Sequence, residues 1–206
     1  MISVGKFVTG PLETNTYLVR NEAGRGLVLD PSSGCADLLQ KVNEEGITLE
    51  AIFLTHAHFD HILGIPEILK AAGSIPVYVF GADSRALSDA GLNGSEWFGE
   101  PFAFNGPVTI ITGDLKRIGS FDVRVVPVAG HTPGGCVLLI DNYCFSGDVL
   151  FAGSIGRSDL PGGNGADLIN GIKSSLLTLP DATIVCPGHG GRTTIGREKA
   201  HNPWLR

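Results

Sequence analysis

The chain has 206 residues, of which 43% are hydrophobic and 17% charged. This composition excludes a disordered chain and predicts one domain, residues 1–206, with a buried core. The formal net charge is −6 and lysine and arginine form no cluster, which excludes the basic surface that a nucleic-acid partner requires.

The first half of the chain predicts strands that alternate with helices. Apolar residues between turn signals predict strands at residues 2–8, 14–20, 26–30, 50–54 and 77–80. Apolar residues at helical spacing predict helices at residues 36–45, 62–72 and 83–90. The Gly- and Pro-rich stretch 91–107 predicts an irregular crossing to the second half.

The second half repeats this pattern in outline. Strands are predicted at residues 108–111, 121–128, 136–140, 143–145 and 183–186. Helices are predicted at residues 166–179 and 192–201. Two comparable halves of this kind favour an α/β fold in which two sheets pack face to face with helices outside.

The cysteines and the N-terminus bear on location. Cys35, Cys136, Cys144 and Cys186 form no C-x-x-C pair, so we expect buried, reduced thiols rather than a disulfide framework. Apolar runs are too short to cross a bilayer, and the first residues lack the basic and apolar parts of a secretion signal. We therefore expect a cytoplasmic protein with no membrane partner.

Polar motifs follow the predicted strands at the points where those strands end. His56 comes directly after the strand at 50–54, and His131 follows the strand at 121–128. Asp148 and His189 follow the strands at 143–145 and 183–186 in the same way. Because strand ends from both halves can meet at one edge, their loops can supply side chains to a shared cleft.

The stretch Thr-His-Ala-His-Phe-Asp-His, residues 55–61, is the densest of these motifs. Side chains alternate in an extended segment, so His56 and His58 point the same way and can bind one ion. Asp60 and His61 lie just beyond and can face a second ion. Five of the six histidines stand in the polar motifs, and together with two aspartates they are too many for one tetrahedral ion.

These motifs, His56-Ala57-His58-Phe59-Asp60-His61 followed by His131, Asp148 and His189, resemble the metallo-β-lactamase superfamily. The stretches 9–18 and 148–154 extend the resemblance over nearly the whole chain, and they are most similar to the glyoxalase II-like hydrolases. The chain ends at Arg206 without the C-terminal helical extension of full-length glyoxalase II, so it resembles the short, single-domain branch. The resemblance implies a four-layer αβ/βα sandwich.

The resemblance also implies a role for each motif residue. His56, His58 and His131 would hold one divalent ion, Asp60, His61 and His189 a second, and Asp148 would bridge them. Zinc is the expected metal, and iron and manganese suit the same ligands.

The implied reaction is hydrolysis of a small anionic thioester such as S-hydroxyacylglutathione by a metal-bridging hydroxide, with Asp60 as a ligand and proton acceptor. Two dications, two aspartates and one hydroxide give a site charge of about +1, which can attract an anion despite the acidic chain.

Residues outside the ligand set leave two interpretations open. In the glyoxalase II pattern a basic residue matching Arg157 contacts glutathione, but here Asp159 stands two positions later and can pair with it. Trp97 and Phe98 are expected to pack in the core or a loop rather than to line a substrate wall, and Phe59 to shield the metal site.

Competing functions use the same residues differently. A persulfide dioxygenase would hold a single Fe(II) with His56, His131 and Asp148, leaving positions open for oxygen. A β-lactamase shares the ligand set, and a non-catalytic metal-binding module would keep it without turnover. The sequence carries no signal for the oligomeric state or the acyl group.

Overall fold

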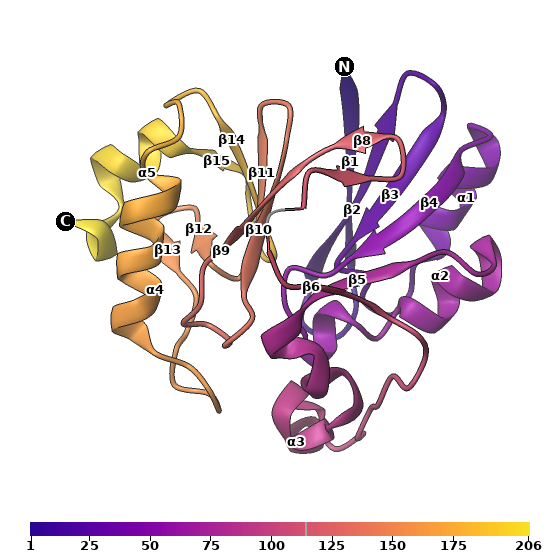
Figure 1. Cartoon of the computed structure of the whole chain (residues 1–206), viewed down its shortest axis with the longest axis horizontal. Coiled ribbons are helices and arrows are strands. Elements are labelled where there is room, and N and C mark those ends of the chain that lie inside the picture. Colours follow the sequence, from indigo (N-terminus) through magenta and orange to yellow (C-terminus); the bar gives the residue numbers. More distant parts are fainter. Residues whose placement is uncertain (114) are drawn as a thin grey trace.

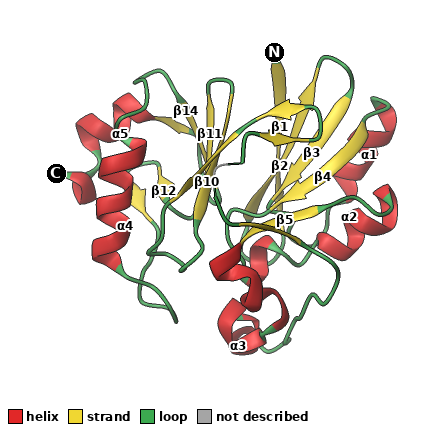
Figure 2. Ribbon diagram, viewed as in Figure 1, coloured by secondary structure: helices red, strands yellow, loops and turns green. Residues whose placement is uncertain are grey.

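Two β-sheets, one from each half of the chain, lie face to face, and helices cover their outer faces (Figures 1 and 2). The structure is a computed structural model that describes residues 1–113 and 115–206. The first sheet has six strands in sequence order, with antiparallel pairs up to the third strand and parallel pairs after it. Its strands are β1 (Ile2–Thr9), β2 (Thr14–Asn21), β3 (Arg25–Leu29), β4 (Thr48–Phe53), β5 (Val77–Phe80) and β6 (Thr109–Ile111).

The second sheet has five strands in the order β15-β14-β11-β10-β9. Their bounds are β9 (Arg124–Pro127), β10 (Cys136–Ile140), β11 (Tyr143–Gly147), β14 (Ile184–Pro187) and β15 (Thr193–Thr194). Only β11 and β14 pair in parallel. Two short hairpins lie outside the sheets: β7 (Arg117–Ile118) with β8 (Phe121–Asp122), and β12 (Leu150–Phe151) with β13 (Ser154–Ile155).

The longer helices form the two outer layers. α1 (Ala36–Glu44) and α2 (Ile65–Ala72) lie against the first sheet, and α4 (Gly165–Gly171) and α5 (Ile195–His201) against the second (Figure 1). A π-helical turn, Ile172–Leu176, continues α4. α3 (Ala90–Asn93) stands among 3₁₀ turns at Gly81–Ser88 and Ser95–Phe98, and two further 3₁₀ turns occupy Phe59–His61 and Pro203–Leu205.

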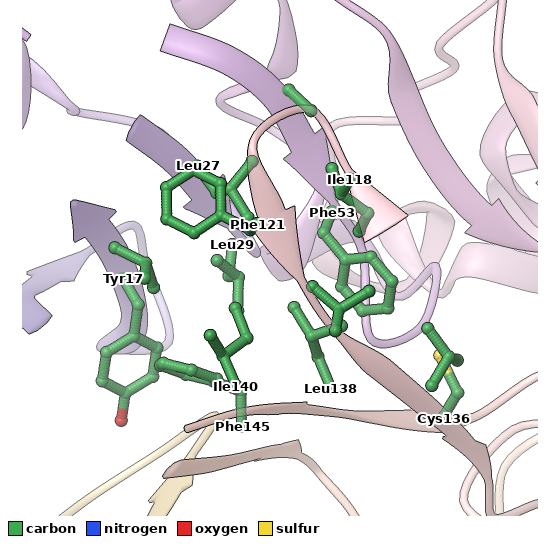
Figure 3. Close-up of a cluster of buried hydrophobic side chains, with 14 of the residues drawn as sticks. Tyr17, Leu27, Leu29, Phe53, Ile118, Phe121, Cys136, Leu138, Ile140 and Phe145 are labelled. Carbon is green, nitrogen blue, oxygen red and sulfur yellow. The ribbon is translucent and has the colours of Figure 1, made fainter. Parts of the chain in front are cut away.

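Three hydrophobic clusters fill the spaces between the four layers. Along β2 and β3, Tyr17 and Leu27 face the second sheet, whereas Leu18 faces α1 and α2, as the two-residue period of a strand requires. The cluster between the sheets joins Phe53 of the first sheet to Leu138 of the second (Figure 3). A third cluster packs α4 and α5 against the second sheet. The four-layer α/β sandwich expected from the sequence is the one observed.

Several predicted elements differ in detail. The helix predicted at 62–72 begins only at Ile65, because a 3₁₀ turn and a further turn at residues 62–64 come first and Pro66 fits the first turn of a helix. The helix predicted at 83–90 is the 3₁₀ turn Gly81–Ser88. The crossing predicted as irregular at 91–107 contains most of α3 and the 3₁₀ turn Ser95–Phe98.

The second half shows similar differences. The strand predicted at 121–128 is divided at Val123 into β8 and β9. The Val123 N–H donates to the Lys116 carbonyl, and pairing with β10 begins only at Arg124. The helix predicted at 166–179 ends in the π-helical turn at Leu176. The helix predicted at 192–201 begins at Ile195, because Thr193 pairs with Val185 and the Thr194 hydroxyl caps the helix at the Arg197 N–H.

The cysteine prediction is confirmed: all four side chains are buried and free. Within the described residues, no helix has both the length and the apolar character needed to cross a bilayer.

We predict that the cluster between the sheets carries much of the stability. Leu138 is fully buried there, so Leu138→Ala should lower the free energy of unfolding by about 2–5 kcal/mol through lost burial and a residual cavity. Val8→Ala, on a side chain that is 57% exposed, should change it by less than about 0.5 kcal/mol. Urea denaturation at fixed metal concentration measures both, and equal effects of the two variants would contradict this packing.

Candidate metal centre

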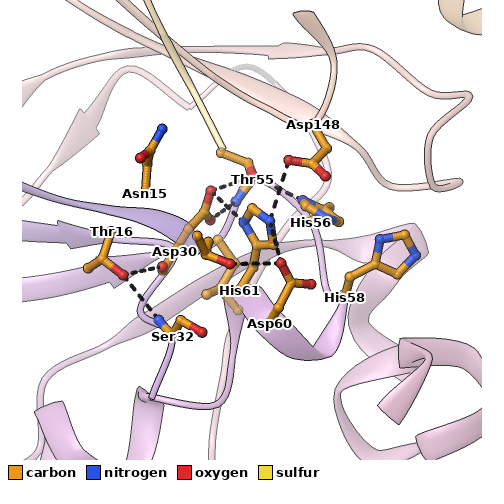
Figure 4. A network of polar contacts seen from close by, with 12 residues as sticks. Asn15, Thr16, Asp30, Ser32, Thr55, His56, His58, Asp60, His61 and Asp148 are labelled. Carbon is orange, nitrogen blue, oxygen red and sulfur yellow. Dashed lines mark hydrogen bonds and ion pairs between the residues drawn. The ribbon is translucent and has the colours of Figure 1, made fainter. Parts of the chain in front are cut away.

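All seven residues predicted as ligands meet at one end of the sandwich, in loops that follow strands. The loop after β4 supplies His56 and His58. The 3₁₀ turn Phe59–His61 supplies Asp60 and His61 directly behind them (Figure 4). The loops after β9, β11 and β14 supply the remaining three, His131, Asp148 and His189. The convergence expected from strand placement is therefore observed.

One group consists of three histidines whose ring nitrogens face one another. His131 Nε2 lies 3.3 Å from His56 Nε2 and 2.9 Å from His58 Nδ1. His131 Nδ1 lies 2.7 Å from the Arg157 carbonyl oxygen, and because a carbonyl only accepts, Nδ1 carries the proton and Nε2 holds a lone pair. The Arg157 backbone thus fixes the tautomer that a metal ligand needs.

Burial keeps two of these histidines, His56 and His58, neutral. Burial, reinforced by the neighbouring His61 and His131 rings, lowers the pKa of His56 well below its usual value. Burial and His131 lower the pKa of His58 to about 3. Neutral imidazole is the form that binds metal, so these histidines need not lose a proton on binding near neutral pH.

The second group adds carboxylates. Asp60 Oδ2 lies 3.3 Å from both His61 Nε2 and His189 Nε2. Asp148 stands between the two groups: its Oδ1 is 3.4 Å from His61 Nε2. Its Oδ2 is 3.5 Å from His189 Nε2 and 3.6 Å from His131 Nε2. One carboxylate therefore reaches both sets of candidate ligands.

Charge inside the second group is concentrated on buried carboxylates. Burial opposes protonation of His61, but Asp60, Asp148 and Asp30 outweigh it and raise its pKa well above the usual value. Burial likewise opposes ionisation of Asp148, yet His61 and His189 hold its pKa well below the usual range. For His189, the bonds to Asp148 and Asp60 outweigh burial and raise the pKa to about 9. The buried carboxylates of this cluster therefore favour positive charge beside them.

The donor set fits metal ions. Ligands about 2.0–2.1 Å from a tetrahedral zinc ion stand about 3.3–3.4 Å from one another, close to the separations of 3.3–3.6 Å among His61, His189, His131 and the carboxylates. Both ring nitrogens of His61 and Oδ1 of Asp148 are buried and form no hydrogen bond among the described residues; their contacts are ion pairs of 3.1–3.4 Å. Buried polar atoms without a well-formed hydrogen bond are costly, and a divalent ion would satisfy them.

Asp30 supports the ligand loop from behind. Its carboxylate accepts bonds of 2.7 Å from both the Thr55 N–H and the Thr55 hydroxyl, and it lies 3.1 Å from His61 Nδ1 (Figure 4). Asp30 has a positive φ of 49°, a backbone state that aspartate tolerates better than most residues. Sequence reasoning placed it at the end of a predicted strand and missed this role. The available signal was the position of Asp30 at the end of a predicted strand, as for the candidate metal ligands.

Asp83 joins two ligand loops. It accepts hydrogen bonds from the Ala57 N–H at 3.1 Å, the Thr132 hydroxyl at 2.8 Å and the Gly134 N–H at 2.6 Å. Burial raises the pKa of Asp83, and these three donors act in the opposite direction. The loops that carry His58 and His131 are therefore held together by one buried carboxyl group. This role could not be predicted from the sequence, because the donors to Asp83 lie far from it along the chain.

A cavity of about 430 Å³ opens above the candidate ligands. Its floor includes His58, Asp60, His131, Asp148 and His189, and its apolar walls are Leu12, Phe59, Trp97, Phe98 and Leu160. Trp97 and Phe98 were expected to pack in the core or a loop. That interpretation is wrong, because both are more than half exposed and line this cavity. Phe59 is buried beside the ligands, with its ring centroid 4.7 Å from that of Phe98.

Arg157 also lines the cavity, and Asp159 binds it side-on. Arg157 Nε and Nη2 donate to the two Asp159 oxygens at 2.8 and 2.9 Å. Both side chains are exposed. Of the two interpretations left open by the sequence, the pairing with Asp159 is present in the structure.

The sequence matches a known family. The family model described as "Metallo-beta-lactamase superfamily" matches residues 9–189. "Probable metallo-hydrolase YqgX" of Bacillus subtilis is 38% identical over 200 residues, covering 95% of this chain and 94% of that protein. "Hydroxyacylglutathione hydrolase GloC" of Haemophilus influenzae is 32% identical over 203 residues, covering 94% and 93%.

Solved structures share the architecture. BLEG-1 B3 metallo-beta-lactamase is 38% identical with a TM-score of 0.94, covering 98% of this chain and 99% of that one. TTHA1623, solved in a di-iron-bound form, is 35% identical with a TM-score of 0.87, covering 98% and 100%. ETHE1 from Myxococcus xanthus is 29% identical with a TM-score of 0.79, covering 98% and 83%. The expected metallo-β-lactamase fold is confirmed.

We predict that Gly188, directly before His189, is required for metal binding. A Cβ at this position would collide with Asp148 Oδ1 and the His61 ring, so Gly188→Ala should displace both candidate ligands and weaken zinc affinity by about 10–100-fold. Competition with a zinc-binding dye measures this. Gly191→Ala is the matched control, because nothing lies within 4 Å of its Cβ. Equal zinc affinities of the two variants would show that Asp148 and His61 do not hold the ion.

Proposed function

The chain belongs to the metallo-β-lactamase superfamily, and we propose that it is a dinuclear metal-dependent hydrolase that cleaves a thioester such as S-hydroxyacylglutathione. The observation that carries this proposal is the pair of complete ligand groups joined by one carboxylate. Three histidine nitrogens form one group, Asp60, His61 and His189 form the other, and Asp148 contacts both.

In this proposal each ligand group holds one divalent ion. His56, His58 and His131 would hold the first and Asp60, His61 and His189 the second, and Asp148 would be a ligand shared by both. Zinc suits these nitrogen and oxygen donors, as do iron and manganese. The di-iron form of TTHA1623, which shares 35% of its sequence with this chain, supports two ions per chain.

The chain's own residues would position the substrate and handle the proton. Bound divalent ions would supply a water of lowered pKa and polarise the thioester carbonyl. Asp60 lies on the cavity floor, where the Thr14 hydroxyl donates to its Oδ2 at 2.8 Å and holds it in place. Its carboxylate is placed to accept a proton as water attacks, and the departing thiolate can then take that proton.

A thioester is the substrate class that the relatives and the cavity support best. GloC, at 32% identity, carries the name of a hydroxyacylglutathione hydrolase, and the cavity of about 430 Å³ is large enough for a small thioester. A β-lactam is the second class to test, because BLEG-1, at 38% identity, is described as a B3 metallo-beta-lactamase.

A mononuclear Fe(II) persulfide dioxygenase is the competing function. It would use His56, His131 and Asp148 and leave Asp60, His61 and His189 without an ion. In that second group the buried Asp60 carboxylate lies 3.3 Å from Nε2 of the buried His61, whose ring nitrogens form no hydrogen bond among the described residues. The cost of burying that cluster without a cation favours two ions.

We predict two divalent ions per chain and thioester hydrolysis without oxygen uptake. Elemental analysis of the purified protein, run beside thioester, β-lactam and oxygen-consumption assays, measures all four quantities. One iron per chain together with oxygen uptake would contradict the hydrolase proposal and support the dioxygenase function. Turnover of a β-lactam but not of the thioester would support the metal site and contradict the thioester as substrate.

We also predict that turnover depends on the ligands of both ions. His131→Ala and Asp60→Ala each remove one ligand from a different group, so each should lower kcat/KM more than about 100-fold. Circular dichroism checks that both variants fold. His201→Ala is the matched histidine control, because His201 is exposed at the end of α5. Full activity in either ligand variant would overturn the proposed function.

A further inference from the structure

The lining of the cavity, apart from the candidate ligands, has few charged groups that could contact the thiol portion of a thioester substrate. Apart from the candidate ligands, the cavity is lined by the apolar side chains of Leu12, Phe59, Trp97, Phe98 and Leu160 and by Asn93, Gly94 and Arg157. Among the described residues that line it, Arg157 is the only one with a permanent positive charge. A thiol portion that carries carboxylates, as glutathione does, therefore has one cationic partner available on these walls.

That partner is already engaged. The Asp159 carboxylate takes both Nε and Nη2 of Arg157, at 2.8 and 2.9 Å, which is the two-point geometry that a substrate carboxylate would also use. Hydrogen bonding to Arg157 lowers the pKa of Asp159 to about 2, so Asp159 is ionised throughout the neutral range. A substrate carboxylate must displace this group and then remain beside its negative charge.

The aromatic wall favours a different thiol portion. Trp97 is 53% and Phe98 58% exposed, and Phe98 rests on the buried Phe59 ring. An apolar group laid against them would remove this surface from water and make ring contacts, which is favourable without any charge on the substrate.

We propose that Asp159 sets the specificity of this site: by occupying Arg157 it disfavours a carboxylate-bearing thiol portion and leaves the cavity selective for a thioester with an uncharged, apolar thiol portion. This inference rests on the proposed thioester hydrolysis and narrows it, because it makes a glutathione thioester such as S-hydroxyacylglutathione a less favoured substrate than a thioester with an apolar thiol portion. Asp159 acts here through Arg157, so it is a positioning residue and not a catalytic one.

The test compares two thioesters that share one acyl group. One carries glutathione and the other benzyl mercaptan, which is apolar and uncharged, and kcat/KM is measured for both with the metal-loaded enzyme. The variants are Asp159→Ala, Asp159→Ala combined with Arg157→Gln, and Asp181→Ala. Asp181 is the matched control, because it is an exposed aspartate paired with Lys199 and does not line the cavity.

The wild-type enzyme should prefer the benzyl thioester. In Asp159→Ala, the kcat/KM for the glutathione thioester divided by the kcat/KM for the benzyl thioester should rise about three- to tenfold. The change should come mainly from a lower KM for the glutathione thioester, because Arg157 becomes available for one charge-assisted contact with a substrate carboxylate. The double variant should lose this gain, and Asp181→Ala should leave the ratio unchanged. An unchanged ratio in Asp159→Ala, or an equal rise in Asp181→Ala, would overturn the inference.

A binding measurement separates this inference from the proposed function. S-hexylglutathione is a thioether that cannot be hydrolysed, and Trp97 is one of two tryptophans in the chain. In a Trp204→Phe background, quenching of Trp97 emission reports ligand binding in the cavity. Asp159→Ala should tighten Kd about three- to tenfold. If neither thioester is hydrolysed the proposed function fails, whereas an unchanged Kd rejects the role of Asp159 whatever the activity.

Discussion

Two aspartates, Asp60 and Asp148, are held among histidines at the end of a β-sandwich, and the ion pairs that the structure gives them in its described part are with histidines alone. Buried carboxylates in such surroundings are stable only if positive charge joins them. Protonated His61 and His189 meet part of this demand in the metal-free protein. Divalent ions bound by the proposed ligands would meet it fully.

The sandwich makes this cluster possible because its packing fixes where the strands end. The cluster between the sheets holds Phe53 near the end of β4 and Phe145 within β11 (Figure 3), so the loops beyond them start from rigid positions. Asp30 and Asp83 then bind the loops to one another through backbone donors. Ligands held this way need little rearrangement when an ion binds. The cavity lies above them, and other loops supply most of its apolar lining.

Much of this arrangement could be predicted from the sequence, and the exceptions have physical reasons. His56, His58 and Asp60 stand in one short motif, and their placement after a strand predicted a shared cleft. Asp83 could not be found this way, because its donors come close only after folding, and the only signal for Asp30 was a carboxylate at the end of a predicted strand. Whether Trp97 and Phe98 are packed or line the cavity depends on where the stretch 91–107 lies in the fold. Neither secondary-structure propensity nor hydrophobic periodicity determines that position. Two-residue strands such as β12 and β13 carry no readable pattern.

The claim on which the rest depends is that side chains from separate loops hold two cations side by side. Anomalous scattering from crystals of the zinc-loaded protein, recorded at the zinc absorption edge, tests it most directly. We predict two peaks, one about 2.0–2.2 Å from ligand atoms of His56, His58 and His131, and one equally close to Asp60, His61 and His189. Asp148 should contact both. A single peak, or a second peak remote from His61, would contradict the two-ion site.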